Sequence, residues 1–156
     1  MMFFVSDTST KKYHYKENTT ISHFVDIHSQ FKDRNCLLAA LLEMGWTIDQ
    51  LEVHNSPQYL YGYKGDRRND IANIIIRKNN VGIASNDIGF RLEIDGTYTA
   101  IISEYDRSKY SDDWLNKLKQ SYSVQVTLKQ AKLKGMTVKK SVKADGTIAI
   151  VLMKGT

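Results

Sequence analysis

The sequence contains one cysteine, one proline and no long apolar run. A single thiol, Cys36, excludes a disulfide within the chain and argues against a zinc site built from cysteines. No apolar stretch approaches the roughly 18 residues that a membrane-spanning helix needs. The opening segment, Met1 to Val5, lacks the length and the basic flank of a secretory signal. We therefore expect no membrane span and a reducing, intracellular compartment.

Motifs for bond-making chemistry are also missing. The sequence has no nucleophile elbow, no P-loop and no dinucleotide fingerprint. His14, His23, His28 and His54 do not recur at the spacing that places two metal ligands on one helix face. We therefore predict no catalytic residue, no cofactor and no metal, and we interpret the histidines as surface or structural residues. An enzyme with dispersed catalytic groups is an alternative, which a deep pocket at His23, His28 or His54 would favour.

The chain nevertheless has the size and composition of an ordinary domain. Its 156 residues, 42% of them hydrophobic, are enough to bury a core. Residues 1–20 are polar and without pattern, so we predict a flexible N-terminal arm. Residues 21–156 carry periodic apolar residues throughout, and we predict that they form a single α+β domain.

Two helices and about seven strands are expected in that domain. Asp33 or Asn35 caps the first helix and Gly45 ends it. Ser111 caps the second helix, which ends at Gly135 and has a bend or a phase shift near residues 123–127. Alternation and turn signals predict strands over residues 21–28, 59–63, 71–76, 88–94, 97–102, 136–142 and 147–153. The fold class that follows is α+β, a mostly antiparallel sheet of about six or seven strands with two main helices packed on one face.

Positive charge is concentrated near the end of the sequence. Residues 1–113 hold 13 Lys/Arg and 16 Asp/Glu, a balance of −3, whereas residues 114–156 hold nine lysines and one aspartate, a balance of +8. Such a segment can attract nucleic acid, an anionic membrane or an acidic protein. The candidate binding lysines are Lys129, Lys132, Lys134, Lys139, Lys140 and Lys143. The simpler alternative is a solvated lysine face.

A second candidate binding surface combines aromatic and basic residues. Three tyrosines alternate along one expected strand, which a basic loop follows; the candidate residues are Tyr59, Tyr61, Tyr63, Lys64, Arg67 and Arg68. Aromatic rings on one strand face beside cationic side chains are suited to stacking single-stranded RNA bases. The alternative is a sheet face packed under a helix, with the basic residues in a solvated turn.

Short blocks of the sequence, taken in order, resemble a known family. They include Ser22-His23-Phe24, Met44-Gly45-Trp46, Tyr61-Gly62-Tyr63-Lys64-Gly65, Asp70-Ile71-Ala72-Asn73, Asp87-Ile88-Gly89-Phe90, Asp95-Gly96-Thr97-Tyr98 and Asp145-Gly146-Thr147. Their order across residues 21–153 resembles the thirty-fifth hypothetical chloroplast reading frame family, which occurs in plastids, cyanobacteria and other bacteria.

This resemblance implies a small α+β protein of the plastid stroma or the bacterial cytoplasm. It assigns no activity, cofactor or catalytic residue to this chain. The N-terminal arm and the strongly basic C-terminal segment depart from the family pattern, which leaves a bacterial or phage relative as an alternative source.

The function expected from the sequence is therefore binding. We predict a non-catalytic accessory or adaptor protein that binds another macromolecule, an acidic protein or protein complex, through its charge-polarised surface. The alternative is an RNA-binding module that uses the tyrosine-lined strand, the basic loop and the lysine-rich tail.

Overall fold

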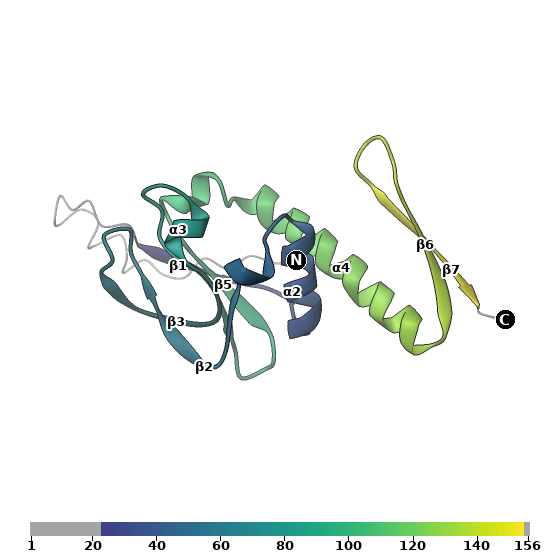
Figure 1. The fold of residues 1–156 in the computed structure, drawn as a ribbon, viewed down its shortest axis with the longest axis horizontal. Helices are drawn as coiled ribbons and strands as arrows, with labels where there is room; N and C mark the ends of the chain where they lie inside the picture. Colours follow the sequence, from purple (N-terminus) through teal and green to yellow (C-terminus); the bar gives the residue numbers. More distant parts are fainter. Residues whose placement is uncertain (1–22, 155–156) are drawn as a thin grey trace.

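The computed structural model describes residues 23–154, which form a larger and a smaller β-structure joined by one long helix (Figure 1). The larger one is a five-stranded antiparallel sheet, and the smaller one is a two-stranded hairpin. The arm expected over residues 1–20 lies outside the described residues, as do the first residues of the first expected strand.

The main sheet has the strand order β1-β5-β4-β3-β2, and all neighbouring strands are antiparallel. The strand bounds are Phe24–His28 (β1), Glu52–Tyr61 (β2), Arg67–Ile76 (β3), Ile88–Leu92 (β4) and Tyr98–Ser103 (β5). The Asp95-Gly96 turn joins β4 to β5, and Gly96 adopts a φ of +86° that favours glycine. Because β5 lies between β1 and β4, all six of its residues are buried.

Helices α2 (Arg34–Glu43) and α4 (Asp112–Leu133) cover one face of this sheet. The Asp33 carboxylate caps α2 by accepting a hydrogen bond from the Cys36 amide at 3.0 Å. The chain turns away from α2 at Gly45, where φ is +107°. The core between sheet and helices includes Ile27, Phe31, Leu37, Leu41, Ile74, Phe90, Ile102, Leu115 and Leu118. This layer is the main source of stabilising apolar burial.

On the opposite face of the sheet the β2–β3 hairpin curls. The pairing register shifts between Val53 and Gln58 and again between Tyr59 and Tyr61, and each shift bends the ribbon. Leu60, Ala72, Ile75 and Ile101 form a second, smaller buried cluster there. Gly89 is required beneath it, because a Cβ at this position would lie 2.6 Å from the Cβ of Ala72.

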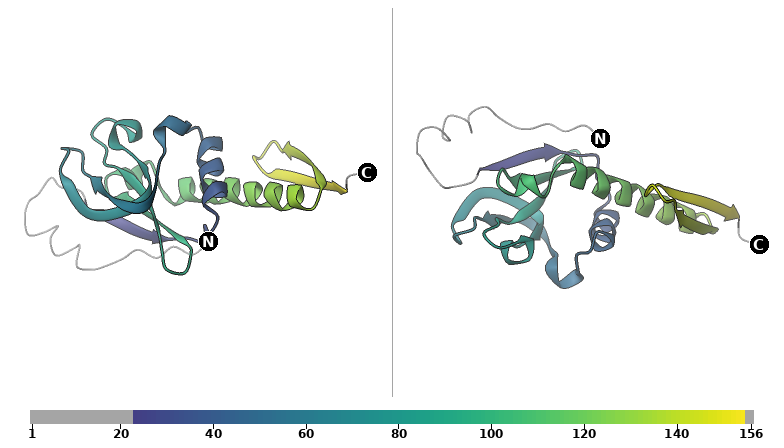
Figure 2. Two further views of the ribbon diagram at one scale, coloured as in Figure 1. Left: turned by 60° about the horizontal axis from the view of Figure 1, so that its bottom comes forward. Right: turned by 90° about the horizontal axis from the view of Figure 1, so that it is seen from above.

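The second sheet consists only of β6 (Met136–Val142) and β7 (Ile148–Lys154). The Asp145-Gly146 turn closes the hairpin, with Gly146 at a φ of +87°. The hairpin follows the C-terminal end of α4 and lies beyond the main sheet along the long axis of the molecule (Figure 2). It packs against α4 and pairs with no other strand of residues 23–154.

The structure confirms the expected fold class and shows that the strands form two separate sheets. All seven strands are present, but five form one sheet and two form another. Helix α4 runs without interruption from Asp112 to Leu133, so the bend expected near residues 123–127 does not interrupt it. Three short helical segments were not predicted: η1 (Ile48–Gln50), α3 (Lys78–Val81) and η2 (Asp106–Ser108).

Candidate macromolecule-binding surfaces

Tyr59 and Tyr61 are at the surface of β2. Leu60, between them, is fully buried in the second cluster, whereas Tyr59 is 43% exposed and Tyr61 is 36% exposed. Tyr63 is half-buried and lies in the turn beyond the end of the strand. The expected row of three strand tyrosines is therefore two strand residues and one turn residue. The exposure of Tyr59 and Tyr61 argues against the alternative in which this face packs under a helix.

The basic loop contacts these rings directly. The Arg67 guanidinium carbon lies 4.5 Å from the centroid of the Tyr59 ring, and the Lys64 Nζ lies 5.5 Å from that of Tyr63. Both are cation–π distances. The structure therefore brings together the tyrosines and two of the three basic residues that the sequence proposed as one surface.

Arg68 has different contacts. Its guanidinium carbon lies 5.2 Å from the ring centroid of Phe24 on β1. Its Nη1 lies 3.9 Å from a carboxylate oxygen of Asp66. Arg68 thus contacts β1 and its own turn, away from the Tyr59 ring that Arg67 covers.

A charged cluster behind the tyrosine strand fixes its position. Arg77, at the end of β3, donates to both carboxylate oxygens of Glu52 at 2.8 and 2.9 Å, and to the buried Asp87 at 2.8 Å. Asp87 also accepts hydrogen bonds from the amides of Tyr61 and Lys78, each at 2.7 Å. Because β2 curls, this carboxylate links the far end of β2 to the start of β4. The hydrogen bond from Arg77 lowers the pKa of the Glu52 carboxyl.

A second polar network anchors the turn that carries Tyr63. The Tyr63 amide donates to the side-chain oxygen of Asn86 at 3.0 Å. The Asn86 side-chain amide donates to Ser103 Oγ at 2.9 Å, and Ser103 donates to Asp106 at 2.7 Å. Asn86, Ser103 and Asp106 are all buried. These buried polar groups satisfy one another and hold the turn in place.

The candidate tail lysines fall into two groups. The Lys129 ammonium forms an ion pair with the carboxylate of Asp33, so it ties the second half of α4 to the start of α2. This contact lowers the pKa of the Asp33 carboxyl and raises that of the Lys129 ammonium. The other five lysines are exposed and form no ion pair within residues 23–154; they are Lys132, Lys134, Lys139, Lys140 and Lys143.

An open groove of about 450 Å³ separates the hairpin from α4. Lys119, Gln120, Val124 and Thr127 line it from the helix, and Ile148 and Ile150 line it from β7. One face of the hairpin is thus directed toward the helix, but the two do not close into a filled core.

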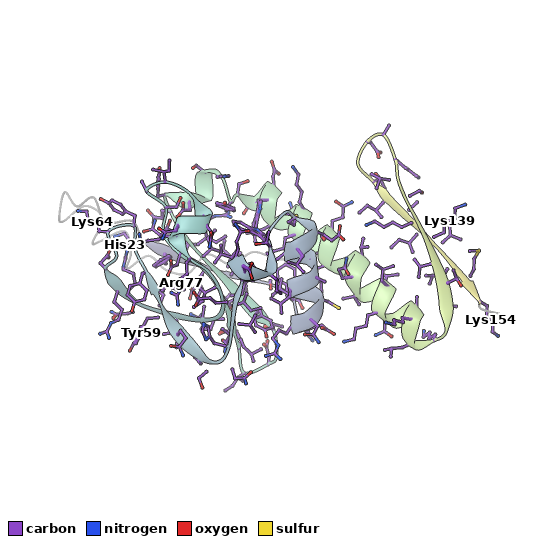
Figure 3. The ribbon with its side chains drawn as sticks, viewed as in Figure 1. His23, Tyr59, Lys64, Arg77, Lys139 and Lys154 are labelled. Atoms are coloured by element: carbon purple, nitrogen blue, oxygen red, sulfur yellow. The ribbon has the colours of Figure 1, made fainter. Side chains whose placement is uncertain are left out.

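The two candidate surfaces lie at opposite ends of the molecule. Figure 3 shows Tyr59 and Lys64 on the curled end of the main sheet and Lys139 and Lys154 on the hairpin. The α4 helix separates them. The tyrosine strand and the lysine-rich tail therefore do not form one continuous binding surface.

The histidines have contacts of their own in the fold. His54 Nε2 lies 2.9 Å from a Glu52 oxygen, and His28 Nδ1 lies 3.2 Å from Thr99 Oγ1. Within residues 23–154, no group of three or more His, Cys, Asp or Glu side chains is placed to hold a metal ion. No helix of this described part combines the length and the apolar character needed to cross a bilayer.

Sequence reasoning missed the cluster of Arg77, Glu52 and Asp87. These residues are 10 and 25 positions apart, and only the curl of β2 brings them together. The one local signal is an arginine and an aspartate at the ends of two predicted strands, where an apolar pattern stops.

A curled antiparallel sheet covered by helices on one face, with an appended basic hairpin, defines an α+β protein. The chain belongs to the family described as Protein of unknown function (DUF1257), whose model matches residues 40–151. That match begins within α2 and ends within β7, so it includes β6 and the first four residues of β7. No curated protein and no solved structure matches the chain.

Proposed function

We propose that this protein is a non-catalytic accessory protein, an adaptor that binds an acidic protein or protein complex through the lysine-rich end of the molecule. The observation that carries the proposal is the group of five exposed lysines on and around the hairpin, which form no ion pair within residues 23–154. Charges without internal partners are free to meet opposite charge on another molecule.

The type of cation supports a protein partner. The cations of this end are all lysines, whereas reading of base edges favours the planar fork of arginine. An ammonium group on a flexible stem suits carboxylates presented at varied positions. Apolar side chains beside these lysines, among them Val151 and Met153, add surface that a protein partner can cover.

The family resemblance supports a location. The order of the blocks that resemble the thirty-fifth hypothetical chloroplast reading frame family favours the plastid stroma or the bacterial cytoplasm as the place where the partner is found. Fractionation of the native cells, with an antibody against this chain, tests the location.

Reversal of the tail charges tests the adaptor function. We expect the full-length chain to retain a defined complex in affinity purification from its native cells, and the triple variant Lys139→Glu/Lys140→Glu/Lys143→Glu to lose it, because the attraction becomes repulsion. The matched control is Lys64→Glu/Arg67→Glu/Lys78→Glu, which changes net charge equally at the other end. Equal retention by both variants, or a free monomer in native extracts, contradicts the proposal.

A second candidate function has its own observation. The exposure of Tyr59 and Tyr61, with Arg67 on the first ring, favours single-stranded RNA on the curled end of the main sheet. We expect an oligouridine to bind with an affinity that falls steeply with salt and that Tyr59→Ala weakens. A flat salt response in fluorescence anisotropy contradicts this candidate, and the tail variant serves as its control.

A further inference from the structure

Strand β7 has the sequence of an interior strand but lies at a sheet edge. Residues Ile148 to Met153 are six consecutive apolar residues. Such a run is typical of a strand that is covered on both faces and paired on both sides, whereas a strand with one wet face alternates. Among the strands of residues 23–154, β7 pairs only with β6. Its sequence therefore predicts more strand pairing and more packing on its faces than residues 23–154 provide.

Both faces of the hairpin leave apolar side chains uncovered. Val151 and Met153 share one face and are 54% and 46% exposed, and Leu152 on the other face is 44% exposed. An isolated two-stranded hairpin is marginally stable in water. Residues 148–153 form an apolar edge without a charged residue or a proline, and such an edge is a template for a further strand.

The hydrogen-bond pattern identifies which amides of β7 are available. The Lys143 amide donates to the Thr147 carbonyl at 2.8 Å, so this pair bonds inward. In an antiparallel ladder, inward and outward residues alternate. Ser141 with Ala149 and Lys139 with Val151 are then the next inward pairs, given the observed register. The amides of Ile150 and Leu152 therefore point away from β6, toward the free edge.

Charge decides what can occupy that edge. Residues 134–154 contain five lysines and one aspartate, a balance of +4. A second copy of this chain, paired through β7, would bring an equal net charge of +4 alongside, which long-range repulsion between like charges opposes. A strand that carries carboxylates would instead lie two strand spacings, about 10 Å, from Lys139 and Lys140 on β6, and their positive charge would attract it at low salt.

We propose that β7 accepts an acidic β-strand of the partner protein, which pairs with the free edge and completes a sheet of at least three strands. This inference rests on the proposed adaptor function and names the surface and the kind of segment that it recognises. Main-chain hydrogen bonds to Ile150 and Leu152 supply binding, while lysines and apolar side chains select a segment with carboxylates and β-branched residues.

A peptide probe tests the proposal with the full-length chain. The probe is a capped seven-residue peptide of alternating valine and glutamate, matched to the seven residues of β7. We expect it to bind at low salt and to slow hydrogen exchange at the outward amides of Ile150 and Leu152. The inward amide of Val151 should change little, because β6 already bonds it. A control peptide with lysine in place of glutamate should not bind.

A pair of substitutions at one position separates the edge from the side chain. Leu152→Pro removes an outward amide and leaves the inward bonds to β6, a placement that an edge strand tolerates. We expect it to weaken peptide binding by about tenfold or more, because it removes one hydrogen bond and blocks the approach of a strand. Leu152→Thr keeps the amide and should weaken binding much less. Retained exchange protection of the inward amides shows that each variant hairpin is folded.

The other outcomes each overturn the inference. Equal binding by Leu152→Pro and the parent chain, or no binding of the acidic peptide at low salt, excludes strand addition at β7. Competition by an oligouridine assigns the surface to RNA. Dimers in sedimentation of the free chain, with slow exchange at Ile150 and Leu152, assign it to a second copy.

The design also separates this inference from the proposed function. If Lys139→Glu/Lys140→Glu/Lys143→Glu abolishes the native complex while Leu152→Pro leaves it intact, the adaptor function stands and strand addition is wrong. If neither substitution affects the native complex, both are wrong.

Discussion

The two β-structures of this protein obey the same local rules and differ in what covers them. In the main sheet every residue of β5 is buried, because β1 and β4 flank it and α2 and α4 cover its sheet. In the hairpin, no residue of β6 or β7 is buried. Both contain an Asp-Gly turn and apolar strands. Strand and turn signals thus determine that a hairpin forms. The neighbouring strands and the covering helices determine whether its residues are buried or exposed.

This difference separates stability from recognition. Loss of a contact in the main sheet leaves a buried group without its partner, which is costly to the whole fold. Loss of a contact in the hairpin exposes little additional surface, because the side chains of the hairpin already contact water. We therefore expect substitutions in the sheet to change the free energy of unfolding, and substitutions in the hairpin to change binding.

The largest effect is expected from Asp87→Ala. Asp87 is buried and accepts hydrogen bonds from Arg77 and from the amides of Tyr61 and Lys78. Its removal should lower the free energy of unfolding by about 3 kcal/mol or more, because an arginine and two amides lose their acceptor. Urea denaturation measures this change.

The matched control for Asp87 is an aspartate in an exposed ion pair. Asp112→Ala breaks the pair with Arg107 at the start of α4 and should cost less than about 1 kcal/mol, as exposed pairs do. Equal costs for the two substitutions would show that the cluster around Arg77 does not fix the curl of β2.

A smaller effect is expected from Gly89→Ala. The new Cβ would lie 2.6 Å from the Cβ of Ala72 and 3.1 Å from the side chain of Leu60. The backbone of β4 must therefore move away from these two side chains, which should lower the free energy of unfolding by about 1–3 kcal/mol. Gly146→Ala is the counterpart in the hairpin, where φ is +87° and the space is open. We expect its strain to speed hydrogen exchange within the hairpin and to leave the urea midpoint of the main sheet unchanged. If Gly146→Ala also lowered the urea midpoint of the main sheet, the hairpin and the main sheet would unfold as one unit.

The smallest effect on the free energy of unfolding is expected from a decrease in pH. The hydrogen bond from Arg77 lowers the pKa of Glu52 below its ordinary value of 4.5. A carboxyl whose pKa is lower in the folded chain than in the unfolded chain stabilises the fold at any pH above its unfolded-state pKa. This stabilisation is lost as the pH falls through the folded-state pKa. The free energy of unfolding should therefore decrease below pH 4.5, and Glu52→Gln should flatten that slope. An unchanged slope would assign the acid sensitivity to other carboxyls.

Local signals were sufficient to predict much of this fold. Asp33 and Gly45 bound α2, and the turns at Asp95-Gly96 and Asp145-Gly146 locate two hairpins, because capping and turn chemistry act over a few residues. The lysine-rich end was visible as charge along the chain.

Other features depend on distant residues and were not predictable. The curl of β2 arises from register shifts against β3, which no pattern in either strand specifies. The cluster of Arg77 and Asp87 and the position of Tyr63 follow from that curl. The separation of the hairpin from the main sheet depends on whether α4 continues through residues 123–127, where the apolar pattern weakens although the helix does not end.

Helix α4 sets the geometry between the two ends of the molecule. Its 22 residues, at a rise of about 1.5 Å each, span about 33 Å; Leu115 and Leu118 near its start belong to the core, and the hairpin follows its C-terminal end. Because α4 packs against α2 and is tied to it by the ion pair of Lys129 with Asp33, the helix holds the hairpin at a set distance from the main sheet. Each residue inserted after Ala131, where the end of α4 is exposed, would advance the hairpin by about 1.5 Å and rotate it by about 100° around the helix axis. The length of α4 therefore encodes how far from the sheet, and in which direction, a captured strand would be presented.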